Sequence, residues 1–318
     1  MARIGSDIQK SKKILAASGL VSIPTETVYG LAANAFDTDA VLKIFSAKNR
    51  PSFDPLIVHT DSLAKIESFT KNIPTKAHAL TEKFWPGALT LLLEKTPLIP
   101  DIVTSGLHKV AVRIPAHPLA LGLLSQLDFP LAAPSANPFG YVSPTTAKHV
   151  DDQLGNKIDY ILDGGDCNIG IESTIVGFED DEAIVYRLGG LSINDIEKVI
   201  GTVKIMPHST SQPKSPGQLK SHYAPKKKIV IGNISELLIR YNEKNIGVLS
   251  FQKQYPEIAN ERQIQLSSEG SISEAAKNLF GALRKFDTTQ VDIVLTELVP
   301  NEGLGLAIND RLKRAAAE

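Results

Sequence analysis

Two cations, Lys48 and Arg50, stand just before Pro51 at the end of a segment with helical periodicity. Because proline disfavours helical backbone in the residue that precedes it, the helix should end here and both side chains should project into a loop. Basic side chains at a helix C-terminus often only complement the helix dipole. The alternative is a phosphate clamp, in which each charge-assisted hydrogen bond contributes about 1.5–3 kcal/mol.

A third cation, Arg113, lies within the strand-like segment 110–115. Its side chain should point to the opposite face from those of Val112 and Ile114, because side chains alternate along a strand. The guanidinium then either faces solvent or binds a carboxylate through its planar fork. A fourth cation, Arg187, lies near the end of another strand-like segment.

Polar side chains occupy several short turns. Thr27 belongs to segment 22–35, which taken alone is a strand end followed by a polar turn. Ser135 and Asn137 lie in a Pro-Ser-Ala-Asn turn, and Ser143 stands before an expected helix, for which it is an N-cap candidate. Each signal is weak by itself.

Three other residues carry groups that titrate or donate hydrogen bonds. Ser173 lies at a strand entrance, and His59 follows the apolar stretch "PLIV", where a histidine usually only satisfies a strand end. Cys167 lies in the turn-rich loop "DGGDCNIG" and is interpreted as a non-catalytic thiol.

The elements that must position these residues alternate along the first two thirds of the chain. Helical periodicity predicts helices over 6–17, 38–47, 75–84 and 144–154. Strands are predicted over 20–23, 56–59, 88–94, 109–114, 130–133, 158–162, 173–177 and 183–187. The irregular connections favour a mixed α/β domain with a large sheet over a purely parallel one.

The pattern stops over residues 204–227, which are rich in proline, serine and lysine. Apolar strands and helices then resume, as in a small β/α domain with a parallel sheet. We therefore expect an N-terminal domain over 1–204, a linker over 205–227 and a Rossmann-like domain over 228–318. A structureless connection of this length is usually functional or disordered.

Composition excludes several classes of protein. The 318 residues have a net charge of −1, so any polyanion must be held locally, and the single cysteine builds neither a disulfide nor a cysteine zinc site. The sequence has no Walker A motif, no dinucleotide-binding glycine motif, no G-x-S-x-G and no H-E-x-x-H. No apolar stretch is long enough to span a bilayer, and we expect a cytoplasmic location.

The motifs occur together in one order: "PTETVYGL", "KNRP", "PLIVH", "FWPGALT", "VAVRIP", "PSAN", "SPTT", "ESTIV", "RLGG" and "SPGQLKSHYAP". In this order the chain resembles the YrdC-type threonylcarbamoyl-AMP synthases in their long, two-domain form, over nearly its whole length. The resemblance implies a YrdC-like mixed α/β domain with a twisted sheet and a positively charged concave surface.

The resemblance also implies an activity. Such enzymes condense L-threonine, bicarbonate or CO2, and ATP to threonylcarbamoyl-adenylate and pyrophosphate. A threonylcarbamoyl transferase complex then modifies the adenosine beside the anticodon of tRNAs that read ANN codons. ATP would be a substrate, with Mg2+ bound mainly through its phosphates and no dedicated protein metal site. A weak contact with tRNA is also expected, and none with a membrane.

Matching motif positions carry the family's site residues onto this chain. The residues expected to bind L-threonine are Thr27, His59, Arg113, Ala133 through its backbone, and Ser173. Those expected to bind ATP are Lys48, Arg50, Asp54, Lys109, Ser135, Asn137, Ser143, Arg187 and Tyr223. Lys48 and Arg50 are the catalytic candidates, with Lys48 directed at the leaving phosphates. Lys109 replaces the small hydroxyl residue usual in the family, so its backbone is the expected contact.

Two other functions are compatible with parts of this pattern. A non-catalytic RNA-binding module of YrdC-like fold would show tRNA affinity that falls steeply with salt. A carbamoyltransferase of hydrogenase maturation also contains a YrdC-like domain, but its zinc-finger-like portions need cysteines that this chain lacks.

The linker itself carries chemistry-bearing residues, His222 and Tyr223, between Pro216 and Pro225. A passive tether needs only polar and flexible residues. We therefore expect residues 207–225 to fold over the N-terminal site as a lid that excludes water, with Tyr223 near the nucleotide.

Overall fold

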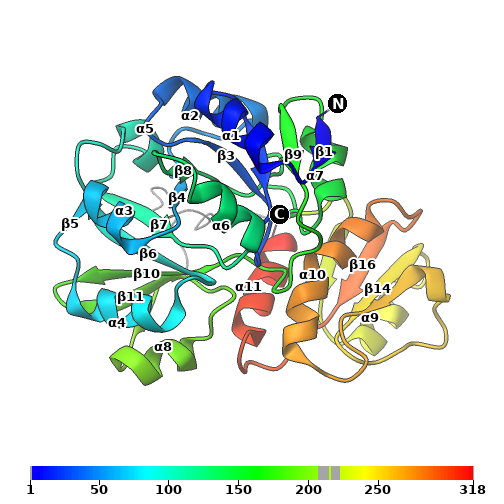
Figure 1. The fold of residues 1–318 in the computed structure, drawn as a ribbon. Helices are drawn as coiled ribbons and strands as arrows, with labels where there is room; N and C mark the ends of the chain where they lie inside the picture. The colour runs from blue at the N-terminus through cyan, green and yellow to red at the C-terminus, as the bar shows by residue number, and fades with distance from the viewer. Residues whose placement is uncertain (1, 207–214, 216–222, 318) are drawn as a thin grey trace. The chain divides into compact units, whose positions relative to one another are not determined.

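The computed structural model describes residues 2–206, 215 and 223–317 (Figure 1). The chain forms two compact units. The first comprises residues 1–139, 144–168 and 172–219, and the second comprises 140–143, 169–171 and 220–318. The second unit thus includes two short segments, 140–143 and 169–171, that interrupt the first unit along the chain. Domain boundaries drawn in chain order did not anticipate them. Most of the predicted linker and lid lies outside the described residues.

The first unit is built on a mixed sheet, as predicted. Its strands run in the spatial order β1-β9-β2-β3-β8-β4-β7-β6-β10-β11-β12, with β5 paired to β6. The sheet contains parallel pairs, such as β4 with β7, and antiparallel pairs, such as β6 with β7. The strands are β1 (Arg3–Gly5), β2 (Val21–Ile23), β3 (Gly30–Asn34), β4 (Ile57–His59), β5 (Thr70–Lys71), β6 (Leu89–Lys95), β7 (Lys109–Arg113), β8 (Leu131–Ala132), β9 (Tyr160–Leu162), β10 (Thr174–Glu179), β11 (Glu182–Arg187) and β12 (Lys204–Ile205).

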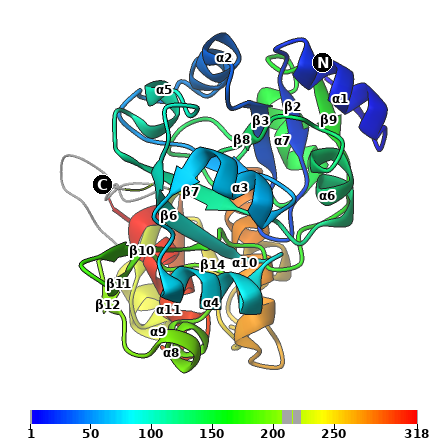
Figure 2. The ribbon, with the colours of Figure 1, turned by 60° about the vertical axis from the view of Figure 1, so that its left-hand side comes forward.

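Helices cover this sheet and bury its apolar side chains. They are α1 (Ile8–Ala16), α2 (Thr38–Lys48), α3 (Leu63–Phe69), α4 (Thr75–Phe84), α5 (Asp101–Thr104), α6 (Pro118–Leu124), α7 (Ala147–Leu154) and α8 (Ile193–Ile200). Figure 2 shows α3 in front of β6 and β7. Ile66 and Phe69 of α3 and Leu80 of α4 join the main apolar core. Each fully buried aliphatic or aromatic side chain of this kind stabilises the fold by about 1.5–3 kcal/mol.

Local signals set the helix ends near the site. Asp37 caps α2 by accepting hydrogen bonds from the backbone amides of Asp39 and Ala40, and Asn49 ends the helix with φ of 52°. Asparagine tolerates this left-handed conformation better than most residues. Helix α7 begins at Ala147, and its N-cap is Thr146, which accepts from the amide of His149. The expectation that Ser143 caps this helix was therefore wrong, because the helix begins three residues later and the extended Thr146 takes the N-cap position.

The second unit contains a parallel sheet in the order β13-β16-β14-β15, as the apolar strands predicted. Its strands are β13 (Lys228–Ile231), β14 (Ile246–Ser250), β15 (Gln263–Gln265) and β16 (Ile293–Thr296), and its α-helices are α9 (Ile234–Arg240), α10 (Ile272–Phe286) and α11 (Gly305–Ala315). Helices α10 and α11 lie side by side (Figure 1). Within the described part of the chain, no helix is both long and apolar enough to cross a membrane.

Candidate active site

The sheet of the first unit brings His59 and Arg113 together. Strands β4 and β7 are parallel neighbours, and His59 is the register partner of Arg113 at their carboxyl ends. Partners in register project to the same face of a sheet, so the imidazole and the guanidinium belong to one cluster. Both side chains are buried. The prediction that Arg113 simply faces solvent is excluded.

Arg113 is held by three neighbours. Its Nε donates to the carbonyl of Gly87 at 3.1 Å, and Nη1 donates to Oγ1 of Thr27 at 2.8 Å. Its Nη2 lies 2.8 Å from Oε1 of Glu26, with both side chains more than 90 % buried. The turn that precedes β3 therefore supplies a hydroxyl and a carboxylate to one guanidinium. Glu26 was not among the site residues predicted from the sequence.

A second guanidinium, that of Arg187, is anchored to Ser173. Arg187 Nε donates to the carbonyl of Ser173 and Nη2 to its hydroxyl, each at 3.0 Å. The Ser173 hydroxyl also lies 2.7 Å from that of Thr90. This grouping follows from the sheet, since the amino ends of β6 and β10 meet the carboxyl end of β11. Thr90 is a further polar residue of the site that sequence reasoning missed.

His59 is neutral in this environment. Burial, reinforced by the positive charges of Arg113 and Arg187, lowers the pKa of its imidazole to about 3. Its Nδ1 lies 3.2 Å from the carbonyl of Ile57. Since a carbonyl oxygen only accepts, Nδ1 carries the proton and Nε2 is left as an acceptor. The geometry fits a partner that donates, such as a hydroxyl group.

The predicted signature of Lys48, Arg50, Ser135 and Asn137 is brought together, but Lys48 points at protein backbone. Its Nζ donates to the carbonyl of Ser135 at 2.5 Å and also to that of Asn137. Burial, with Arg50 nearby, lowers the pKa of this amine well below its usual value. The Lys48 side chain therefore holds the Pro-Ser-Ala-Asn turn through two of its backbone carbonyls.

Backbone pairing fixes the same turn from the other side. Ser135 forms a bridge with Gly30, and the amide of Ala136 donates to the carbonyl of Tyr29 at 2.8 Å. The turn is thus tied both to the segment that carries Glu26 and Thr27 and to the end of α2. Hydrogen bonds thus join three segments far apart in the sequence: the turn before β3, the end of α2 and the Pro-Ser-Ala-Asn turn.

Arg50 and Asp54 form a second ion pair in the loop after α2. Arg50 Nη2 lies 2.9 Å from Oδ2 of Asp54, and its Nε and Nη2 also donate to the carbonyls of Asp54 and Pro55. The guanidinium stands 5.9 Å from the ring centre of Phe139. The loop therefore holds Arg50 in a fixed orientation.

The other predicted residues of the first unit lie in the same sheet. Ala133 follows β8, and its amide donates to the carbonyl of Ile57 at 2.8 Å. Lys109 begins β7, at the opposite end of the strand from Arg113, and its ammonium donates to the carbonyl of Phe178 at 2.6 Å. The side chain of Lys109 is therefore not part of the cluster, which leaves its backbone as the predicted contact.

Ser143 and Tyr223 belong to the second unit, and their roles as nucleotide contacts stay predictions. The carbonyl of Ser143 accepts from Nε of Arg284 at 3.2 Å. Tyr223 is buried, with φ of 65°, and its ring stacks on Phe280 with centroids 5.5 Å apart. The guanidinium carbons of Arg311 and Arg314 lie 4.8 and 4.6 Å from the centre of the Tyr223 ring. His222 lies outside the described residues.

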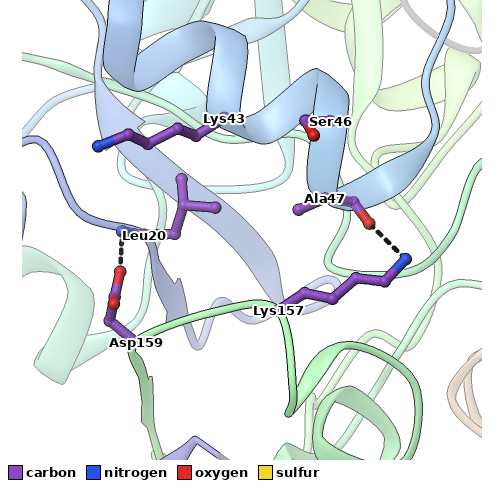
Figure 3. Close-up of a pocket in the computed structure, with 6 residues that line it drawn as sticks. All are labelled: Leu20, Lys43, Ser46, Ala47, Lys157 and Asp159. Atoms are coloured by element: carbon purple, nitrogen blue, oxygen red, sulfur yellow. Dashed lines mark hydrogen bonds between the residues drawn. The ribbon is translucent and has the colours of Figure 1, made fainter.

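A separate pocket of the first unit, about 470 Å³ in volume, carries no such chemistry (Figure 3). Its three charged side chains all bond to backbone. Asp159 accepts from the amide of Leu20 at 2.8 Å, and Lys157 donates to the carbonyl of Ala47 at 3.3 Å. Lys43 donates to the carbonyl of Ser18 at 2.8 Å. We therefore place the candidate active site at the Arg113 cluster.

Fold and site together define the class: an α/β protein with a mixed sheet that carries buried arginines and hydroxyls. Two family models match the chain. The model of the Sua5, YciO and YrdC proteins, described as "Telomere recombination", matches residues 13–189. That described as "Threonylcarbamoyl-AMP synthase, C-terminal domain" matches residues 191–317.

Relatives agree with these models. A threonylcarbamoyl-AMP synthase of Pyrococcus abyssi is 43 % identical over 93 % of this chain and 90 % of its own length. One of Bacillus subtilis is 41 % identical over 97 % of this chain and 92 % of its own. The chain belongs to the threonylcarbamoyl-AMP synthase family.

Solved structures place the fold in the same family. The crystal structure of P. abyssi Sua5 complexed with L-threonine matches with a TM-score of 0.93 and 40 % identity, over 99 % of this chain and 97 % of that one. A HypF structure from T. kodakarensis, at 19 % identity and a TM-score of 0.52, covers 58 % of this chain and 25 % of that one and shares the fold alone.

Proposed function

We propose that this chain condenses L-threonine, bicarbonate or CO2, and ATP to threonylcarbamoyl-adenylate and pyrophosphate. As a member of its family it is an enzyme, a transferase that uses ATP to make an adenylate. The observation that carries the proposal is the buried Arg113, in register with His59 and bonded to Thr27. The Pyrococcus relative of the same fold was crystallised with L-threonine.

L-threonine binds in this proposal through groups that complement its own. Arg113 binds the carboxylate, since its fork matches two carboxylate oxygens. Nε2 of neutral His59 accepts from the threonine hydroxyl, and Thr27, Ser173 and the backbone of Ala133 complete the site. The required protonation state of His59 is favoured by its low pKa, about 3.

ATP binds beside threonine through the cationic signature and its neighbours. Arg50 and Arg187 are the cations that neutralise phosphate charge. The remaining contacts proposed from the family pattern are Asp54, Lys109 through its backbone, Ser135, Asn137, Ser143 and Tyr223. Lys48 acts indirectly, because its ammonium holds the backbone of the Ser135 turn. The prediction that Lys48 itself contacts the leaving phosphates has no support from this geometry.

The chemistry needs two anions held in line. The threonine ammonium releases one proton to solvent, and the free amine attacks CO2 and releases a second proton to give a carbamate that keeps one N–H. A carbamate oxygen then attacks the α-phosphorus of ATP. The bond from that phosphorus to the bridging oxygen breaks, and pyrophosphate leaves. Positioning and charge stabilisation supply the rate enhancement. No side-chain nucleophile is required, and burial raises the pKa of the Cys167 thiol to about 12, so that it is not a nucleophilic thiolate.

Mg2+ accompanies ATP in this proposal. The described residues include no group of three histidine, cysteine or acidic side chains placed to hold a metal ion. A cation of this kind can instead bind through substrate phosphates and water, with few protein ligands. It would neutralise the triphosphate, while Arg50 and Arg187 orient it.

The biological setting follows from the product. The adenylate hydrolyses readily and needs a second protein, a threonylcarbamoyl transferase complex, to carry its acyl group to tRNA in the cytoplasm. We further propose that the linker, residues 205–227, contributes a lid that joins domains 1–204 and 228–318, and that the catalytic face is concave and positively charged.

Incubation with all three substrates, and with each omitted in turn, tests the proposal. Mass spectrometry should detect threonylcarbamoyl-adenylate only in the complete mixture. Arg50→Ala should abolish threonine- and bicarbonate-dependent pyrophosphate release. If the complete mixture yields no adenylate, and the protein instead binds tRNA with strongly salt-dependent affinity, the chain is a non-catalytic RNA-binding module.

A further inference from the structure

The ion pair between Glu26 and Arg113 is buried and incompletely bonded. Nη2 of Arg113 and Oε1 of Glu26 are 2.8 Å apart, with 4 % and 9 % of the two side chains exposed. Yet neither Nη2 nor either carboxylate oxygen of Glu26 makes a hydrogen bond to any residue that the structure describes. The charges are close enough to attract, but the N–H bonds of Nη2 do not point at the carboxylate.

Such a pair is costly unless something completes it. Buried charges are normally both paired and hydrogen-bonded, because desolvation otherwise outweighs their attraction. The neighbouring hydroxyl groups of Thr25 and Thr27 do not donate hydrogen bonds to the Glu26 carboxylate. Oγ1 of Thr25 donates to the carbonyl of Val28 at 2.6 Å, and Oγ1 of Thr27 accepts from Arg113. Glu26 therefore keeps unused acceptors and Arg113 an unused donor, side by side.

A free α-amino acid has the complementary groups. It carries an acceptor-only carboxylate and a donor-only ammonium on one carbon, so two opposite protein charges that are neighbours can bind both. We propose that Glu26 binds the ammonium group of L-threonine while Arg113 binds its carboxylate. This inference rests on the proposed function and adds a residue to it.

The contact would also position the reacting atom. The nitrogen held by Glu26 is the one that attacks CO2 once the ammonium has released a proton to solvent. On carbamate formation it releases a second proton and keeps one N–H, from which Glu26 can still accept a hydrogen bond. Glu26 would then fix where the carbamate forms, next to the oxygen that must face ATP. A compound with a hydroxyl in place of the amine presents no cation to Glu26.

Binding of two ligands to variants of Glu26 tests this. The ligands are L-threonine and its 2-hydroxy analogue, in which a hydroxyl replaces the α-amino group, each titrated by calorimetry without ATP. In the wild type, threonine should bind more tightly than the analogue. Glu26→Gln should lower the affinity for threonine about 10- to 100-fold, because a charge-assisted hydrogen bond is lost. The affinity for the analogue should change by less than about threefold, because its contacts to Arg113 remain.

Two further variants keep the result interpretable. Glu26→Asp retains the charge and should keep a preference for threonine even if the glutamine variant does not fold. Glu67→Gln, on the exposed face of α3, is the matched control and should behave as wild type.

Equal weakening of both ligands by Glu26→Gln would make Glu26 a mere support for Arg113 and overturn the inference. Unchanged or tighter threonine binding would do the same, as would a wild type without preference for the amine. A wild type that binds threonine poorly and makes no adenylate would instead refute the proposed function itself.

Discussion

Each unit of the molecule contains a cluster of buried charges, and the two clusters differ in the protein groups that contact these charges. In the first unit Arg113 and Glu26 lie close together, with hydrogen-bonding capacity unused in the described structure. In the second unit Arg311 donates to Asp310 at 2.5 Å, and Arg311 and Arg314 both lie over the ring of Tyr223. An aromatic face attracts a cation with about 2 kcal/mol or more when the pair is desolvated.

The difference separates a ligand site from a structural cluster. In the second unit Nε and Nη2 of Arg314 also lack a hydrogen-bond partner among the described residues, but Arg311 and Arg314 both face the ring of Tyr223. Their role is therefore to hold Tyr223 and α11. In the first unit the charges are arranged for a partner that the protein does not supply. Both clusters look alike in composition, and only their contacts distinguish them.

Removing a charge from the first cluster should have the largest effect on activity. Arg113→Ala should lower kcat/KM for threonine about 1000-fold, or about 4 kcal/mol, because it removes the carboxylate contact and leaves Glu26 buried and unpaired. Pyrophosphate release at varied threonine concentration measures this. Arg3→Ala, on an exposed strand, is the control. A loss below tenfold would remove Arg113 from the substrate site.

Removing a charge from the second cluster should instead affect stability. Arg311→Met should destabilise the second unit by about 3 kcal/mol, because Asp310 loses a buried partner. Hydrogen exchange should then show faster opening of α10 and α11, with the first unit's sheet unchanged. Lys313→Met, exposed on the same helix, is the control. Unchanged exchange in α11 would show that the cluster is not structural.

The neutral His59 predicts a pH dependence. Its pKa is about 3 in the folded protein and about 6.5 in the unfolded chain, so only the unfolded chain takes up this proton between those values. The free energy of unfolding is therefore highest above pH 6.5. It falls by up to about 1.4 kcal/mol per pH unit as the pH drops from 6.5 towards 3. Denaturant unfolding of wild type and His59→Gln from pH 7.5 to 5 measures it. Equal slopes would contradict a buried, neutral His59.

The smallest effect is expected at Cys167. Burial and the negative charge of Glu26 raise the pKa of its thiol, so Cys167 contributes no reactive thiolate. Cys167→Ala should keep threonine-dependent activity within about twofold of wild type. The wild type should also react slowly with thiol reagents at pH 8, because its thiol is buried. Loss of activity in the alanine variant would assign the thiol a role that its raised pKa argues against.

Much of the fold could be predicted from the sequence because its strands are apolar and its helices periodic. The predicted helix over 75–84 matches α4, and the strand over 109–114 matches β7 within one residue. Strand β3 was missed because its sequence, "GLAAN", has small residues and no alternation. Helix α6, "PLALGLL", is apolar on all sides and shows no helical period. Helix α8 had a signal that was overlooked, a Ser192 cap followed by Asp195.

The sequence predicts most residues of the site, but not which of them contact each other. The motifs identified Arg113, His59 and Ser173, and the structure brings them into one unit. Glu26 belongs to the "PTETVYGL" segment, but nothing in the sequence connects it to a guanidinium on a distant strand. The ammonium of Lys48 was assigned to phosphate because sequence alone does not show that the Ser135 turn packs against the end of α2.

The central claim is that the first unit binds a free amino acid at Arg113 and Glu26 and joins it, through a new carbamate, to AMP. The most direct measurement is mass spectrometry of the products formed from ATP, L-threonine and carbon-13-labelled bicarbonate. We predict an adenylate that contains both threonine and the heavy carbon, and none when the 2-hydroxy analogue replaces threonine. An adenylate without the label, or ATP cleavage that does not depend on threonine, would contradict the account.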